Sequence, residues 1–425
     1  MGAPLEALRG RSVMISTERQ LTAALALCEL DGIARRMLLC TPDMSPTHVS
    51  SAITDAEIDT IVTDGGGPAK NVAHDTSLIF VGDRLKPCEG TPDRSVDTEW
   101  LLLTSGTTGR PKLAVHTLAS LVGPLNDGLV VQDAPVWSTF YDIRRYGGLQ
   151  ILLRAFVGGG SMVLSSAGEP VADFLSRAGA NRVTHISGTP SHWRRTLMSA
   201  ATSRMNPRYV RLSGEACDQA ILDNLRQAYP DANVAHAFAS TEAGVAFDVR
   251  DGQAGFPASL IGQIGKDVSI RVEDGSLRIR SSRVADRVIG NHGRALSDAE
   301  GYVDTGDIVE LRGDRYYFAG RREGVINVGG LKVHPETIEA VINQHPAVHM
   351  SRVSGRSSPI TGAIAVAEVV INPSAAACGV SFAAIRNEIL GLCRGRLAPH
   401  EIPVTIREIS SLEIAASGKL VRRHA

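Results

Sequence analysis

The chain has 425 residues, with 44 lysines and arginines against 45 aspartates and glutamates, and its formal net charge is −1. This length predicts two or three domains, and the balanced charge argues against a nucleic-acid binder, which needs a basic stripe. Apolar residues make up 43% and charged residues 21% of the chain, values typical of a folded soluble protein.

The sequence offers no signal for a membrane or secreted location. Its longest apolar stretch, 363–371, is interrupted by Glu368 and falls short of the ~18 residues that span a bilayer. The first residues, MGAPLEALRGRS, lack the apolar core of a signal peptide. The six cysteines lie far apart, without a CxxC or zinc spacing. We therefore expect reduced thiols, a cytoplasmic protein and no membrane span.

Short β-branched runs alternate with helical patterns over the first part of the chain. Strands are expected at 12–16, 36–40, 60–64, 77–81 and 162–166, and helices at 21–36 and 219–230. Such alternation predicts α/β architecture with buried parallel strands.

The pattern changes near residue 269. Asp274-Gly275 and Gly313-Asp314 each separate two alternating runs, which predicts an antiparallel section. Helices at 334–346 and 381–397 then alternate with strands at 363–371 and 403–409. The fold class is therefore α/β: a large N-terminal domain, 1–322, of parallel and mixed sheets with helices plus an antiparallel section, and a small C-terminal α+β domain, 323–425.

A glycine-rich loop follows an apolar strand at 100–103. Its residues are Thr104, Ser105, Gly106, Thr107, Thr108 and Gly109, followed by Lys112. Glycines let backbone N–H groups approach an anion, hydroxyls add donors, and the lysine adds positive charge. The loop is no Walker A motif, because Pro111 replaces its second glycine and no Ser or Thr follows Lys112. It predicts a phosphate site; the alternative is a polar turn.

This loop, TSGTTGRPK, resembles the phosphate loop of the acyl-adenylate-forming superfamily, which includes acyl-CoA synthetases, peptide-synthetase adenylation domains and luciferases. Further segments occur in the order of that family. They are LSGEA at 212–216, FASTE at 238–242, YVDTGD at 302–307, GRREGVINVGGLK at 320–332 and ASGK at 416–419. The resemblance covers roughly residues 30–425, and it implies an ATP-dependent, AMP-forming enzyme.

The resemblance implies an adenine site made by two of these segments. Gly214, Glu215 and Ala216 would contact adenine through the backbone, and the Phe238 ring would stack on it.

The same resemblance implies catalytic roles. Thr241 would bind phosphate, and Glu242 would hold Mg2+, an ion that favours one or two carboxylates plus phosphate oxygens. Asp307 would bind the ribose hydroxyls and Arg321 the nucleotide. Lys419 would be the adenylation lysine, whose ammonium stabilises the charge of the transfer. Taken alone, Glu242 reads as a solvated loop acid and Lys419 as a solvated tail lysine.

Two positions concern the second domain. Glu323 stands where the family has an acid that acts as a hinge, and the small C-terminal domain is expected to be mobile about it. Gly330 corresponds to a glycine that lines the thiol tunnel.

The segment 136–153 should contribute to the acyl pocket. Tyr141 and Asp142 stand where adenylation domains carry an aromatic-Asp pair, whose acid holds the amino group of an amino acid. Asp142 could bind an ammonium group, or Arg144 and Arg145 could neutralise it. Either arginine could also bind a second carboxylate of the substrate, and a polar helix start would explain all three.

The segment 185–190 resembles the family's strand and turn beside the acyl pocket. Gly188 and Thr189 would leave room for the acyl group, and Trp193 could form a wall. His236 could face the acyl group, although a lone histidine there is more often a core hydrogen-bonder.

Together the motifs predict an ATP- and Mg2+-dependent acid–thiol ligase that forms an acyl-adenylate, releases pyrophosphate and passes the acyl group of a small carboxylic acid to coenzyme A. One alternative is a stand-alone adenylation enzyme that loads an aryl or amino acid onto carrier-protein phosphopantetheine. Others are transfer to an amine and a non-catalytic nucleotide-binding regulator. Only about 100 residues precede the phosphate loop, so the N-terminal portion looks shortened, and a homodimer stays open.

Overall fold

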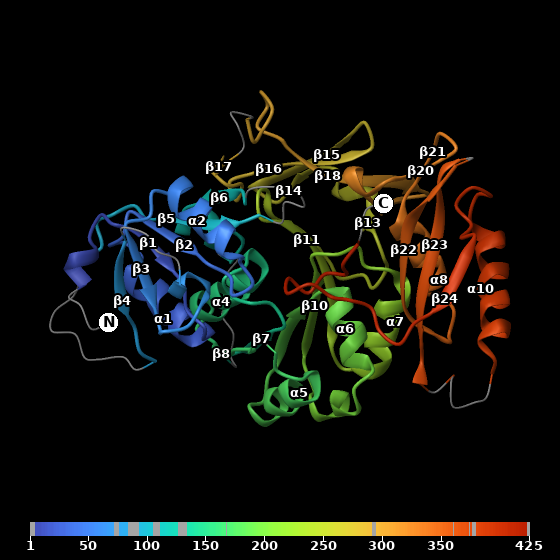
Figure 1. The fold of residues 1–425 in the computed structure, drawn as a ribbon, viewed down its shortest axis with the longest axis horizontal. Coiled ribbons are helices and arrows are strands. Elements are labelled where there is room, and N and C mark those ends of the chain that lie inside the picture. Colours follow the sequence, from blue (N-terminus) through green and yellow to red (C-terminus); the bar gives the residue numbers. More distant parts are fainter. Residues whose placement is uncertain are drawn as a thin grey trace.

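The computed structural model describes residues 5–71, 76–83, 93–104, 111–125, 134–166, 168–290, 295–359, 361–373, 375 and 380–422. In this part of the chain four β-sheets follow one another (Figure 1). The first two are mostly parallel, the third is antiparallel, and the fourth lies in a smaller C-terminal domain. This architecture confirms the predicted fold class.

The first sheet has the strand order β17-β6-β5-β2-β1-β3-β4. Its strands are β1 Ser12–Ile15, β2 Arg36–Leu39, β3 Thr60–Thr63, β4 Ser77–Phe80, β5 Glu99–Leu103, β6 Leu113–His116 and β17 Arg287–Ile289. Strands β6 and β17 are antiparallel additions to a parallel sheet. Helices α1 Gln20–Leu30 and α2 Pro46–Asp55 pack on opposite faces. The predicted helix at 21–36 was too long, because Gly32 adopts a positive φ of 80° and β2 starts at Arg36.

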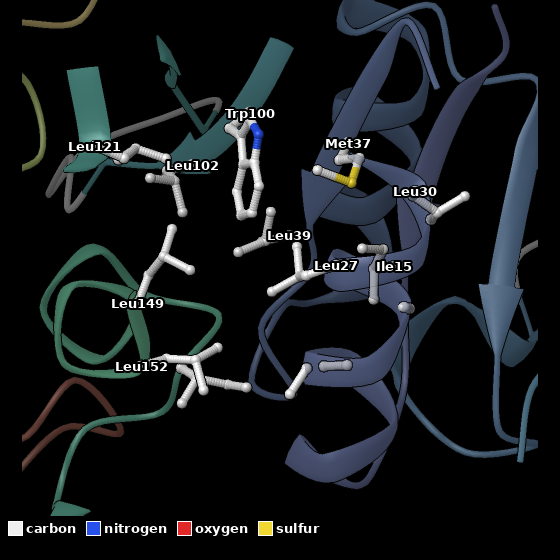
Figure 2. Packing of buried hydrophobic residues seen from close by; sticks show 14 of the residues in the cluster. Ile15, Leu27, Leu30, Met37, Leu39, Trp100, Leu102, Leu121, Leu149 and Leu152 are labelled. Atoms are coloured by element: carbon white, nitrogen blue, oxygen red, sulfur yellow. The ribbon is translucent and has the colours of Figure 1, made fainter. Parts of the chain in front are cut away.

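The largest core lies between the first sheet and α4 Tyr146–Val157. Figure 2 shows Trp100 and Leu102 of β5 on one side and Leu149 and Leu152 of α4 on the other, with their side chains pointing toward one another. Alternate strand residues face this core, while their neighbours pack against α2. This alternation explains why the strands read as continuous apolar runs.

The second sheet has the order β12-β11-β10-β9-β7-β8, and only the β11–β12 pair is antiparallel. Its strands are β7 Val136–Thr139, β8 Ser161–Val163, β9 His185–Gly188, β10 Tyr209–Ser213, β11 Asn233–Ser240 and β12 Gly244–Val249. The remaining helices of this region are α3 Leu118–Val122, α5 Val171–Ala180, α6 Pro190–Leu197 and α7 Gln219–Ala228. Helices α5, α6 and α7 cover the face opposite α4.

The third sheet is antiparallel, as predicted, with the order β13-β19-β18-β16-β15-β14. Its strands are β13 Phe256–Pro257, β14 Gly262–Ile264, β15 Val268–Glu273, β16 Ser276–Ser281, β18 Val303–Arg312 and β19 Arg315–Arg321. Asp274 and Gly275 both adopt positive φ, at 50° and 74°, which is the tight hairpin turn expected from this dipeptide.

The C-terminal domain has its own sheet and core. Its elements are β20 Ile326–Val328, β21 Leu331–Val333, α8 Pro335–Ile342, β22 Val348–Ser358, β23 Gly362–Ile371, α10 Phe382–Arg396 and β24 Thr405–Glu408. Short 3-10 helices are η1 Leu5–Leu8, η2 Pro68–Asn71, η3 Gly123–Leu125, η4 Ala200–Arg204, η5 Ala258–Leu260 and η6 Arg322–Gly324. No helix within the described ranges is long and apolar enough to cross a membrane.

Candidate active site

Three predicted motifs meet at one edge of the second sheet. The parallel strands β9, β10 and β11 end there, and Thr189, Gly214 and Thr241 directly follow them. Ligands of open α/β sheets bind outside the carboxyl ends of the strands. The fold therefore brings together segments that lie far apart in the sequence.

The predicted phosphate loop connects β5 and β6. The backbone N–H of Thr104 donates to the carbonyl of Lys112 at 2.9 Å, which closes the base of the loop. The other predicted phosphate ligands lie outside the described residues; these are Ser105, Gly106, Thr107, Thr108 and Gly109. Their contacts with phosphate stay a prediction.

The backbone of Thr241 and Glu242 is fixed from the first sheet. Nε2 of His116 lies 2.7 Å from the Thr241 carbonyl, and the Ala285 N–H donates to the Glu242 carbonyl at 2.8 Å. Because a carbonyl only accepts hydrogen bonds, Nε2 carries the proton. Burial lowers the pKa of His116, which keeps the ring neutral. These two contacts hold the backbone of the Thr-Glu pair through its carbonyl groups and do not use its side chains.

Lys419 reaches the same edge from the C-terminal segment. A Cβ added to Gly214 would lie 3.6 Å from Cε of Lys419 and 3.8 Å from the Tyr141 hydroxyl. Gly214 adopts a φ of 88°, which favours glycine, and it is exposed at the strand end together with Ala216. The predicted catalytic lysine, adenine segment and acyl pocket are therefore adjacent.

The electrostatics of Lys419 join four motifs. Burial lowers its pKa, and the positive charge of Arg321 lowers it further. The carboxylates of Glu215, Asp307 and Glu242 act in the opposite direction, in that order of size. One ammonium group thus lies within electrostatic reach of every acid that the resemblance assigns to nucleotide or metal binding.

Asp307 and Arg321 face each other across β18 and β19. Their Oδ2 and Nη1 atoms are 3.5 Å apart, and Nη1 also donates to the Thr305 carbonyl at 2.6 Å. Burial raises the pKa of Asp307, while Arg321 and then Lys419 lower it. The pair fixes the Asp307 carboxylate, and its contact with the ribose hydroxyls stays a prediction.

Phe238 lies in a row of aromatic rings between the second and third sheets. Its ring stacks on Phe318 at a centroid distance of 5.3 Å and an angle of 5°, and on Phe247 at 5.9 Å and 20°. The ring is half-buried. These contacts orient Phe238, and its stacking on adenine stays a prediction.

The predicted acyl pocket lies beside Gly214. Tyr141 is buried, and its hydroxyl donates to the Ser213 carbonyl at 2.6 Å. Gly188 packs tightly, since a Cβ there would lie 2.7 Å from the Phe140 ring. Thr189 starts α6, where its side chain accepts from the His192 N–H.

Residues 14–285 match the AMP-binding enzyme family, and residues 337–419 match the C-terminal domain of AMP-binding enzymes. The chain belongs to this family. Membership confirms the resemblance drawn from the phosphate loop and the later motifs, and with it an acyl-adenylate-forming ligase that binds ATP and AMP.

Two relatives are similar over most of the chain. The 2-succinylbenzoate–CoA ligase of Bacillus velezensis is 25% identical over 436 residues, which cover 98% of this chain and 82% of that protein. The 2-succinylbenzoate–CoA ligase of Listeria innocua is 28% identical over 346 residues, covering 76% and 69%.

Solved structures show the same fold. The anthranilate CoA ligase AuaEII in complex with anthranoyl-AMP has a TM-score of 0.82 at 17% identity, covering 97% of this chain and 86% of that one. The o-succinylbenzoate CoA synthetase of Bacillus subtilis has a TM-score of 0.73 at 21% identity, covering 97% and 87%. The amide bond synthetase McbA from Marinactinospora thermotolerans has a TM-score of 0.79 at 17% identity, covering 98% and 89%.

The structure shows which partners Asp142, Arg144 and Arg145 have. The Asp142 carboxylate receives Nε of Arg144 at 2.7 Å and Nη2 at 2.5 Å, and the Arg144 side chain is only 1% exposed. Arg145 instead contacts both oxygens of Asp43 at 2.6 Å. In this structure Arg144 therefore neutralises Asp142 and Arg145 pairs with Asp43, and all three residues directly precede α4, as the polar helix start predicts.

His236 was assigned to the acyl pocket, and the structure gives it the alternative role. Its Nε2 lies 2.9 Å from the Gln253 carbonyl, and burial lowers its pKa. Arg315 binds the same carbonyl at 3.3 Å. His236 is thus a core hydrogen-bonder. Trp193 is a residue of α6. Its side chain is fully buried in the core, and its Nε1 atom faces Gly188.

Two arginines near Asp248, one buried and one half-buried, were missed. Arg211 of β10 is 4% exposed and lies 2.9 Å from Asp248, and its charge acts on the Tyr141 hydroxyl. Burial, followed by the charge of Arg211, lowers the pKa of Arg154 on α4 to about 10. Neither Nε finds a hydrogen-bond acceptor among the described residues. An arginine inside each of the apolar runs ILLRAF and YVRLS was the available signal.

Proposed function

We propose that the chain is an ATP- and Mg2+-dependent acid–CoA ligase. In the first half-reaction a carboxylate oxygen of the acid attacks the α-phosphorus of ATP, and pyrophosphate leaves. In the second, the CoA thiol loses its proton, its sulfur attacks the acyl carbon, and AMP leaves. The observation that carries the proposal is Lys419, which lies at the strand ends within electrostatic reach of Glu242 and Asp307.

The residues have complementary tasks. The ammonium of Lys419 stabilises negative charge that develops between the attacking carboxylate and the α-phosphate. The loop that Thr104 and Lys112 bracket binds the β- and γ-phosphates. Asp307 accepts hydrogen bonds from the ribose hydroxyls, and the Phe238 ring supports adenine. Splitting the acylation into two steps makes each step easier.

The carboxylate of Glu242 is a suitable ligand for Mg2+. Among the described residues no three His, Cys, Asp or Glu side chains gather into a metal site, so a metal bound by those residues alone does not fit. Mg2+ is instead bound by one or two carboxylates together with phosphate oxygens, and the carboxylate of Glu242 would meet that need. When bound, the ion neutralises phosphate charge. The Thr241 hydroxyl would add a neutral oxygen ligand.

Coenzyme A is the preferred thiol. The relatives from Bacillus and Listeria are named CoA ligases, and the case for an amino-acid substrate weakens because Arg144 occupies the carboxylate of Asp142. A carrier protein and an amine remain as outcomes of the test, the latter because an amide bond synthetase has this fold.

The pocket favours an acid with a second anionic group. Arg154 and Arg211 place two cations against the single carboxylate of Asp248, and an uncompensated buried charge is costly. Arg211 precedes Ser213 by two residues on the same strand, about 7 Å from the reacting end by strand geometry. The relatives named for 2-succinylbenzoate are in keeping with this charge.

We also propose the domain boundary between 322 and 323. Glu323 lies in η6, between β19 of the third sheet and β20 of the fourth, where a short segment can absorb the backbone rotation of a hinge. Gly330 lies in the β20–β21 turn with a φ of 86°, and we expect it to line the path of the thiol.

The test is pyrophosphate exchange into ATP over a panel of carboxylic acids, followed by mass measurement of the products with CoA, carrier protein or an amine. We expect acid-dependent exchange, and a thioester with CoA. Lys419→Ala should abolish exchange, whereas Lys266→Ala, an exposed lysine in the β14–β15 turn, should not. Exchange without an acid, or exchange unchanged in Lys419→Ala, would overturn the proposal.

The panel should include matched pairs of acids, each dicarboxylic acid beside its monoamide. The wild type should prefer the diacid, and Arg211→Gln should lose that preference while still activating the monoamide. If the enzyme uses both members of a pair equally, the proposed preference for a second anionic group is wrong. The proposed acid–CoA ligase activity does not depend on this result.

A further inference from the structure

The C-terminal segment 413–422, which carries Lys419, is bound from two sides. On the side of the large domain, the N–H of Leu420 donates to Glu215 at 2.7 Å, and the hydroxyl of Thr189 donates to the Gly418 carbonyl at 2.5 Å. In Figure 1 this red segment leaves β24 and passes beside β10 and α6. It thus brings Lys419 to the strand ends.

On the side of the small domain the segment is bound more strongly. Arg422 makes a bidentate ion pair with the buried Glu339, at 2.6 and 2.7 Å, and Arg352 donates to the Val421 carbonyl at 3.0 Å. Charge-assisted bidentate bonds are stronger than bonds between one backbone group and one side chain. The contacts of the segment with the small domain are therefore stronger than those with the large domain.

The Glu215 carboxylate accepts three hydrogen bonds from the protein itself. Besides Leu420 it accepts the N–H of Ser191 at 2.9 Å and the Ser191 hydroxyl at 3.0 Å. Its side chain therefore faces α6 and the C-terminal segment. Only the backbone of this residue remains for the adenine contact implied by the resemblance.

The fit on this side is close. A Cβ on Gly418 would lie 1.8 Å from Cε1 of His192, and Gly418 adopts a φ of 78°. Burial lowers the pKa of His192 to about 3, so its ring stays neutral against the segment. The segment is thus seated by shape as well as by the two hydrogen bonds.

We propose that Glu215 and Thr189 form a docking clamp, which positions Lys419 for adenylation and opens before the thiol attacks. The inference rests on the proposed function. Both residues act through Lys419, so they are positioning residues. The clamp joins backbone groups of the segment to side chains of the large domain, so it can open without separating the strong ion pair of Arg422.

The test measures the two half-reactions separately in Glu215→Ala and Thr189→Val, with Thr189→Ser as the matched control that keeps the hydroxyl. We expect pyrophosphate exchange to fall about tenfold or more in the first two, with KM for ATP within about threefold. Thioester formation from synthetic acyl-adenylate and CoA should stay at the wild-type rate or rise. Thr189→Ser, which restores the hydroxyl donor, should exchange pyrophosphate faster than Thr189→Val.

A parallel fall of both half-reactions in Glu215→Ala would overturn the clamp, because acyl-adenylate contains the same adenosine and such a fall indicates a nucleotide contact. Unchanged exchange would overturn it as well. Hydrogen exchange of the 413–422 amides gives an independent readout, and we expect faster exchange in Glu215→Ala. If the wild type activates no acid, the proposed function fails, while the amide exchange still decides the clamp.

Discussion

His116 offers a sharp test of how the Thr241–Glu242 pair is positioned. The side chain is fully buried, and its Nε2–H is the donor to the Thr241 carbonyl at 2.7 Å. His116→Leu keeps an apolar body but removes the donor, and a buried acceptor left without its partner costs about 1–3 kcal/mol. If that cost falls on the transition state, adenylation slows about 5- to 150-fold. His116→Gln, whose amide N–H has a similar reach, should lose much less.

The assay is pyrophosphate exchange with both variants, together with urea unfolding between pH 5 and 8. The folded-state pKa of His116 is lowered by burial, so the folded protein binds fewer protons than the unfolded chain. Stability from this group is present above its ordinary pKa of 6.5 and is lost as the pH falls below it. Glutamine does not titrate, so the free energy of unfolding of His116→Gln should not show this fall at low pH. Equal exchange rates in the Leu and Gln variants would refute the hydrogen-bond reasoning.

Three further outcomes are expected. Asp142→Asn should lower the free energy of unfolding by about 3–5 kcal/mol in urea titration, since it leaves the Arg144 guanidinium buried without its counter-ion; an unchanged midpoint would contradict the pairing. Gly418→Ala should reduce pyrophosphate exchange at least about tenfold with little change in melting temperature, because its Cβ has no room; full activity would refute the close fit. The adenylation rate should fall as Lys419 deprotonates at rising pH, at a pH below the ordinary lysine value of 10.5, because burial and Arg321 lower its pKa. Arg321→Gln should move this alkaline limb upward, and an unmoved limb would speak against the coupling.

The sequence predicted β1 to β5 of the first sheet and the hairpin at Asp274-Gly275 because their signals are local, but it did not predict β6 and β17. Apolar runs mark buried parallel strands, and two residues with positive φ mark a tight turn. The end of α1 was misjudged for the opposite reason, since apolar spacing continues into Ile33, and only the turn at Gly32 stops the helix.

The sequence suggests site residues where a motif carries its chemistry in adjacent positions, as in Thr241 and Glu242, whose roles stay predictions. The role of a residue was misjudged where its hydrogen-bond or ion-pair partner lies far away in the sequence. The role of His236 depends on the Gln253 carbonyl, which periodicity does not reveal. Arg211 on β10 likewise pairs with Asp248 on β12, and no spacing in the sequence predicts that these two residues lie together.

The pairing of β17 with β6 has a consequence for the order in which the protein is made. Val115, on the strand that leaves the phosphate loop, pairs with Arg287, and Ala285 holds the Glu242 carbonyl. During synthesis the chain must leave the ribosome to about residue 290 before β17 can pair with β6. Contacts so distant in sequence form slowly, because a long loop must close first. The nucleotide site is therefore completed late on the nascent chain, after the sheets that support it can already have formed.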